Sequence, residues 1–325
     1  MLLVGSSSLP MPIYSHMRAR KRILAEYIEA ALDRLTKDPR IPSFPLGNKY
    51  LVVSDFHLGD KSKADNFRKN EEIALKMLEY YSQKGYYLII NGDFEELWQF
   101  SSETVRLSYS KAFRMIKYLF GDKIIRIYGN HDDKAPWQGL CPGIFLRDKR
   151  GEKVPFLVTH GHLGSRESDL YSWFSRLCVR LFRLIEPFCL QIGLIKAPVF
   201  KRASFYHDFE HIHDQWARKR GYRIICGHSH RAAFASTSYF EQLKRNWTNE
   251  KNVIQKVDIL CALLKEIIRN RHIKFKGPDQ EGFYFNCGCG LYKKGITALE
   301  IDPASISLVK WEKRGTWVYN KMPLN

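Results

Sequence analysis

The chain has 325 residues, of which 45% are hydrophobic and 26% are charged. These values exclude global disorder and allow one large domain with insertions, or two domains. Lysine and arginine exceed aspartate and glutamate by 52 − 34 = 18, which favours polyanionic partners such as nucleic acid, nucleotides or an anionic membrane surface.

The cysteines and the apolar residues indicate the cellular compartment in which the protein is expected. The seven cysteines are scattered, the N-terminal segment lacks a signal-peptide pattern, and no uncharged apolar run is long enough to span a membrane. We therefore expect a reduced, cytoplasmic protein, at most peripheral on the inner face of a membrane.

The N-terminal segment is expected to form a helical extension that precedes the main domain. Apolar residues recur at helical spacing over 17–35, and prolines at positions 39, 42 and 45 then end the helix. The sequence thus predicts a helical extension with a linker at 1–48, followed by one large domain at 49–325.

Within that domain, short apolar runs typical of buried strands alternate with helical patterns. Strands are expected at 50–54, 86–91, 123–128, 155–159 and 222–226, and helices at 71–84 and 105–120. This alternation predicts an α/β fold with helices covering the sheets. Two further helical insertions are expected at about 164–214 and 236–282.

Each of the five predicted strands ends in residues of the types that bind metal ions. The motifs that follow them in chain order are DFH, GDFEE, GNHD, HGH and GHSH. We expect these side chains to converge, because ligands in open α/β folds bind at the carboxyl ends of strands. Oxygen and imidazole donors without thiolates suit Mn²⁺, Fe or Zn²⁺. They suffice for two ions that share one carboxylate, for which Asp93 is the natural candidate.

In this order and at these separations, the five motifs resemble those of the calcineurin-like metallophosphoesterase superfamily, over most of the chain between about residues 49 and 305. The resemblance implies a four-layer αββα metallophosphoesterase sandwich with two divalent ions, manganese being the first choice and iron or zinc the alternatives. It implies a first ion held by Asp55, His57, Asp93 and His230. It implies a second ion held by Asp93, Asn130, His160 and His228.

The same resemblance places His131 on the scissile phosphate and on the leaving group. Two cations can activate a water and neutralise the phosphoryl oxygens, while protonated His131 acts as the general acid. For Asp132 the sequence allows two roles, the orientation of His131 or the capping of the following turn. For His162 we expect a substrate-facing or supporting role rather than direct ligation.

The insertion at 164–214 carries the feature that bears most on the substrate. Between residues 173 and 188, apolar side chains form one helical stripe and Arg176, Arg180 and Arg183 form another. Such a helix suits a membrane interface or an acyl-chain groove, and would make a lid beside the metal motifs. A helix packed in the core with a solvated arginine face would show the same periodicity. We take Trp173 and the three arginines as candidate substrate contacts.

Within the superfamily, the chain is most similar to the UDP-2,3-diacylglucosamine hydrolases of lipid A biosynthesis. The similarity lies in Glu96 and Trp98 of GDFEELW and in the apolar insertion. It implies cleavage of the pyrophosphate of a lipid-linked nucleotide to UMP and a lipid phosphate. The chain departs from that group at His131, where arginine is usual, and at His162, where aspartate is usual.

Two other functions are compatible with the sequence. A phosphodiesterase or nuclease would use the same motifs and would account for the net charge, although the basic residues do not form one block. A non-catalytic scaffold of the same fold is expected to have lost ligands, whereas all seven predicted ligand positions here hold suitable residues.

Overall fold

A computed structural model describes residues 11–165, 168–169, 171–179, 181, 203–238, 244, 247–248, 253–268, 282–292 and 295–324. Two mixed β-sheets form the centre of the molecule. The seven-stranded sheet has the order β1 (Ser43–Pro45), β5 (Gly143–Arg147), β6 (Phe156–Thr159), β7 (Arg223–Cys226), β10 (Tyr284–Asn286), β8 (Ala233–Phe234) and β9 (Thr237–Ser238). The six-stranded sheet has the order β13 (Gly315–Pro323), β12 (Ser305–Glu312), β11 (Ile296–Ile301), β2 (Tyr50–Val53), β3 (Tyr87–Asn91) and β4 (Ile124–Ile127).

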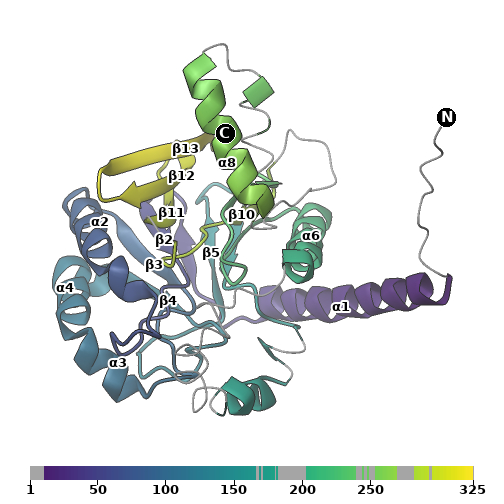
Figure 1. Ribbon diagram of the computed structural model, residues 1–325, viewed down its shortest axis with the longest axis horizontal. Coiled ribbons are helices and arrows are strands. Elements are labelled where there is room, and N and C mark those ends of the chain that lie inside the picture. Colours follow the sequence, from purple (N-terminus) through teal and green to yellow (C-terminus); the bar gives the residue numbers. More distant parts are fainter. Residues whose placement is uncertain are drawn as a thin grey trace.

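The helices cover the outer faces of the two sheets (Figure 1). Helices α2 (Glu71–Gln83), α3 (Ser102–Ser108) and α4 (Ser110–Phe120) pack on the six-stranded sheet. Helices α1 (Met11–Lys37) and α6 (Ala203–Arg220) pack on the seven-stranded sheet. Short 3₁₀ turns lie at Phe67–Lys69 and Gly121–Lys123, and α8 (Val253–Ile268) follows β9 in the chain. The predicted four-layer α/β sandwich is confirmed.

The alternation of side chains along the central strands explains the layers. In β2, Leu51 and Val53 contact the helices, whereas Tyr50 and Val52 belong to the core between the two sheets. Successive side chains of a strand point to opposite faces, so a strand covered on both sides is apolar throughout. The YLVV run has this property, and β2, β3 and β4 pair in parallel, with β4 at the edge of their sheet.

The N-terminal segment packs on the seven-stranded sheet and adds a strand to it. Ile28, Leu32 and Leu35 of α1 are buried in the outer layer beside α6. Part of the expected linker forms β1, which pairs with β5. The N-terminal part of α1 extends beyond α6 (Figure 1). In the part of the chain that the structure describes, no helix meets the length and hydropathy that a membrane span requires.

Candidate metal centre

The seven predicted ligands lie in loops at the carboxyl ends of five strands. These positions are Asp55 and His57 after β2, Asp93 after β3, Asn130 after β4, His160 after β6, and His228 and His230 after β7. Strands β2, β3 and β4 belong to one sheet, and β6 and β7 to the other. Both sheets therefore contribute to one site.

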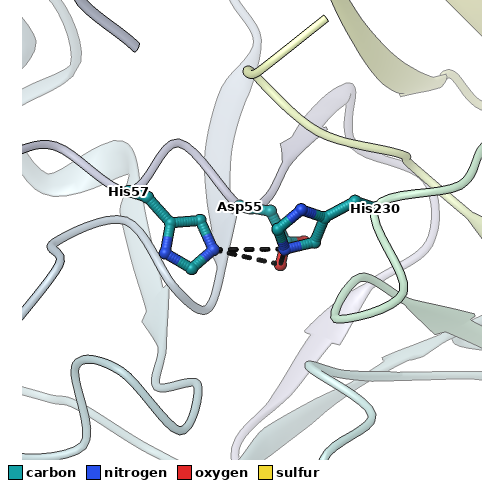
Figure 2. A group of neighbouring side chains, drawn as sticks. All are labelled: Asp55, His57 and His230. Carbon is teal, nitrogen blue, oxygen red and sulfur yellow. Dashed lines mark hydrogen bonds and ion pairs between the residues drawn. The ribbon is translucent and has the colours of Figure 1, made fainter. Parts of the chain in front are cut away.

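Asp55, His57 and His230 form a first group, with donor atoms within 4.8 Å of one another (Figure 2). Asp55 Oδ1 lies 3.0 Å from His230 Nε2 and 3.8 Å from His57 Nε2. The two imidazole Nε2 atoms are 3.2 Å apart. Three donor atoms thus face a common point, as the ligands of one cation do.

Asp93, His160 and His228 form a second group, also within 4.8 Å. Asp93 Oδ2 lies 3.1 Å from His160 Nε2 and 3.6 Å from Nε2 of His57, which belongs to the first group. A single carboxylate therefore stands between the two groups, in the position that a bridging ligand occupies.

Several predicted ligands have a left-handed backbone conformation, which residues other than glycine rarely adopt. Five of the seven predicted ligands have positive φ: Asp55 (55°), His57 (48°), Asp93 (49°), His228 (61°) and His230 (56°). Such conformations cost free energy and cluster at functional sites. Two glycines permit the close approach of the loops. A Cβ at Gly129 would lie 2.1 Å from Asp93 Oδ1, and one at Gly92 would lie 2.4 Å from His160 Nδ1.

The donor atoms fit a pair of divalent cations. Asp55 Oδ1 and His160 Nε2 are buried and pair with other predicted ligands, His230 Nε2 at 3.0 Å and Asp93 Oδ2 at 3.1 Å. Asn130 Oδ1 is buried and, within the described residues, accepts no hydrogen bond. Buried polar atoms without such partners are costly. Carboxylate, amide and imidazole donors are those that manganese, iron and zinc accept. A cation at each group would satisfy these atoms.

The electrostatics of the site also favour added positive charge. Burial raises the pKa of Asp93, but the charges of His160 and His131 outweigh it and hold that pKa well below its ordinary value. Burial lowers the pKa of His160, yet Asp93 and Asp55 raise it to about 9. Burial keeps the pKa of His228 well below its ordinary value, so its imidazole is neutral, the form that binds metal. The ionised carboxylates thus attract a cation.

Glu96 joins the first group to His131, a role that the sequence did not reveal. Its carboxylate lies 2.8 Å from His57 Nδ1 through Oε2 and 2.7 Å from His131 Nδ1 through Oε1. Burial raises the pKa of Glu96, but His131 and His57 lower it to about 2. An ionised Glu96 therefore accepts from both Nδ1 atoms and leaves each Nε2 directed away from it.

Asp132 binds the backbone of the loops after β3 and β4. Its carboxylate accepts hydrogen bonds from the backbone N–H groups of Gly129 (2.7 Å), Asp93 (3.1 Å) and Phe94 (2.9 Å) and from Arg126 (2.7 Å). All its acceptor capacity is thereby used on the loops after β3 and β4. The expectation that Asp132 orients the His131 ring is corrected, since Glu96 holds that ring.

His162 lies beside the second group. It is buried, and its ring centre is 5.4 Å from that of His160 and 6.0 Å from that of Tyr128. Burial lowers the pKa of His162 to about 3, so its ring is neutral. This placement is compatible with the predicted substrate-facing or supporting role.

The structure describes two of the four predicted substrate contacts in the insertion, Arg176 and Trp173. Arg176, in the helix at 172–179, pairs with Asp133 at 2.6 Å, beside the loop that carries His131. Trp173 points outward and is 66% exposed. Arg180 and Arg183 lie outside the described residues.

The comparison with protein families agrees with this site. The calcineurin-like phosphoesterase family matches residues 49–232, more than half of the chain. Among solved structures, a dimetal phosphatase from Danio rerio is similar over 86% of this chain and 99% of its own, at 8% identity and a TM-score of 0.37. A comparison with curated proteins found no match. On the family match, this chain belongs to the calcineurin-like phosphoesterases and is a metal-dependent phosphoester hydrolase.

Proposed function

We propose that the protein hydrolyses the pyrophosphate bond of a lipid-linked nucleotide, with UDP-2,3-diacylglucosamine as the best candidate. The observation that carries this proposal is an exposed apolar surface joined to the rim of the metal centre. It belongs to the helix at 172–179 and its flanks, where Arg176 contacts Asp133.

The apolar surface consists of large side chains that are each about half exposed or more. They are Tyr171, Trp173, Phe174, Leu177 and Leu181. The described part of this helix is therefore not packed in the core on that side. A contiguous set of exposed aromatic and aliphatic groups is typical of a surface that receives another apolar molecule. We assign it to the acyl chains of the substrate, with Trp173 as a contact and an anionic membrane surface as a further neighbour.

The polar end of the substrate would lie at the metal centre. Asp55, His57, Asp93 and His230 would hold one ion. Asp93, Asn130, His160 and His228 would hold the other. A donor set without thiolates suits manganese, iron or zinc, of which manganese is our first choice. When bound, such ions activate a water and neutralise charge on the phosphoryl oxygens.

The chain itself supplies the group that protonates the leaving oxygen. Glu96 lies on the Nδ1 side of His131 at 2.7 Å, which orients the ring and leaves Nε2 to donate. His162, Arg180 and Arg183 remain proposed substrate contacts. Arg176 would reach a substrate phosphate only by leaving Asp133.

The test compares hydrolysis of UDP-2,3-diacylglucosamine with that of bis-p-nitrophenyl phosphate in Mn²⁺, using Asp93→Ala as the inactive control. We expect strong preference for the lipid nucleotide. Leu177→Ser should lower that activity more than it lowers diester hydrolysis. The matched control Trp317→Ser, at an exposed position of β13, should change neither. Turnover of the diester alone would discard this substrate and keep the metal chemistry.

The net charge of +18 favours a second candidate, a nucleic-acid phosphodiesterase. Its test is cleavage of duplex or single-stranded DNA by the same preparation. Cleavage with steep dependence on salt, together with no activity on the lipid nucleotide, would select this candidate.

A further inference from the structure

Trp98 lies against both the proposed general acid and a predicted ligand. Its indole stacks on the His131 ring, with ring centres 4.1 Å apart and planes inclined by 19°. Its Nε1–H donates to the backbone carbonyl of Asn130 at 2.5 Å. Trp98 is only 5% exposed. One rigid side chain therefore fixes the backbone at Asn130 and covers one face of the next residue.

His131 is thereby held from two directions. Glu96 binds its Nδ1 at 2.7 Å, which sets the position of one ring edge but leaves the ring free to turn about that contact. The stacked indole blocks this rotation, because a turned imidazole would collide with its face. Together the two contacts define where Nε2 points.

The insertion reaches the same cluster through Arg176. Its guanidinium pairs with Asp133, two residues after His131, and lies 6.0 Å from the centre of the Trp98 ring. Arginine over an indole face is a favourable cation–π arrangement at about this distance. The helix at 172–179 thus contacts both the loop that carries His131 and the side chain that covers it.

We propose that Trp98 is a positioning residue that sets the direction in which His131 delivers its proton, and that Arg176 makes this positioning depend on the insertion helix. The inference rests on the proposed role of His131 in phosphoester hydrolysis. It is independent of which phosphoester is the substrate. A lipid bound on the apolar surface of that helix would then influence proton transfer through Arg176.

The kinetic test uses leaving groups of different quality. A phenolate needs protonation on departure more than a p-nitrophenolate does, so loss of a positioned acid affects phenyl esters more. We compare the p-nitrophenyl and phenyl versions of one phosphodiester in Trp98→Leu, Trp98→Phe and wild type. Trp98→Leu should lose roughly tenfold to hundredfold more kcat on the phenyl ester. Trp98→Phe, which keeps a stacking ring, should recover part of that loss.

Arg176 is tested in the same way. Arg176→Gln should shift the ratio of the two kcat values in the same direction as Trp98→Leu, and Arg176→Lys should restore part of it. Trp317→Leu and Arg314→Gln, both at exposed positions far along the chain, should leave the ratio unchanged. Equal loss on both esters would overturn the inference, because a general structural defect has that effect.

A second measurement needs no turnover. Crystal structures of wild type, Trp98→Phe and Trp98→Leu should show one His131 ring orientation in the first two and a rotated or divided one in the third. An unchanged His131 ring in Trp98→Leu would overturn the inference even if activity fell. Should the wild type hydrolyse neither model ester, hydrolysis of UDP-2,3-diacylglucosamine decides the proposed function, and the orientation of the His131 ring decides whether Trp98 positions it.

Discussion

At the scale of single residues, Glu96 has the most consequential position after the predicted ligands. One buried carboxylate serves His57, a predicted ligand, and His131, the proposed acid. Groups that hold a ligand imidazole fix its tautomer and orientation, and their loss commonly costs 10- to 100-fold in metal affinity or activity.

Glu96→Gln is expected to weaken both functions at once. A glutamine side chain has one carbonyl oxygen, so it can accept from only one of the two Nδ1–H groups. We expect kcat to fall by roughly 10- to 100-fold and the manganese concentration for half-maximal activity to rise. Steady-state kinetics over a series of metal concentrations measure both. Glu79→Gln, at an exposed position of α2, is the control, and equal behaviour of the two variants would contradict this role.

The sequence was enough to predict a residue of the site where its role depends on the local pattern. Asp55, Asp93 and His160 follow apolar strand runs, and that pattern is visible without a structure. The parts played by Glu96 and Asp132 were not predictable, because they depend on contacts between separate loops. Two adjacent acids, Glu95 and Glu96, look alike in sequence. Only the fold shows that Glu96 contacts the histidines while Glu95 accepts from Trp137.

At the scale of elements, the buried carboxylate of Asp132 joins the loops after β3 and β4, and an ion pair with Arg126 holds this carboxylate in place. Arg126 of β4 is 3% exposed and pairs with Asp132 at 2.7 Å. The same carboxylate binds the backbone of Asp93 and Phe94. Arg126 can lie within the buried strand formed by the run KIIRIY because the Asp132 carboxylate accepts its hydrogen bond.

Asp132→Ala should therefore destabilise the fold strongly. It leaves a buried guanidinium without its closest partner and three backbone N–H groups without acceptors. Breaking a buried pair in this way costs about 3–5 kcal/mol. Urea unfolding of the metal-free protein gives the free energy of unfolding. Asp122→Ala, at an exposed position, serves as the reference, and a loss no larger than its own would contradict this account.

The elements that the sequence predicted well are those buried on both sides. The five expected strands appear within one residue at each end, because continuous apolar runs are typical of such strands. The expected helix at 105–120 is divided into α3 and α4 at Tyr109, whose hydroxyl donates to Asp65 from a buried position. That long-range contact leaves no local signal. The strands β11 to β13 were not predicted. Strand β13 is largely exposed and so lacks the continuous apolar run of a strand buried on both sides.

At the scale of the whole molecule, the sandwich explains how a site is assembled from distant motifs. Each sheet ends its parallel strands at the same edge, and packing of the two sheets brings both sets of loops together. The insertion helix at 172–179 then adds an apolar surface next to that edge. Under the proposed function, the loops would carry the chemistry and the helix at 172–179 would select the substrate.

We expect Asp93 to join two cation sites. The number of manganese ions bound per chain tests this most directly. Equilibrium dialysis of wild type and Asp93→Ala, with Asp122→Ala as control, provides that number. We predict two ions for wild type and for the control, and loss of both in Asp93→Ala, because the carboxylate is shared. Wild-type occupancy in Asp93→Ala would contradict the bridging site.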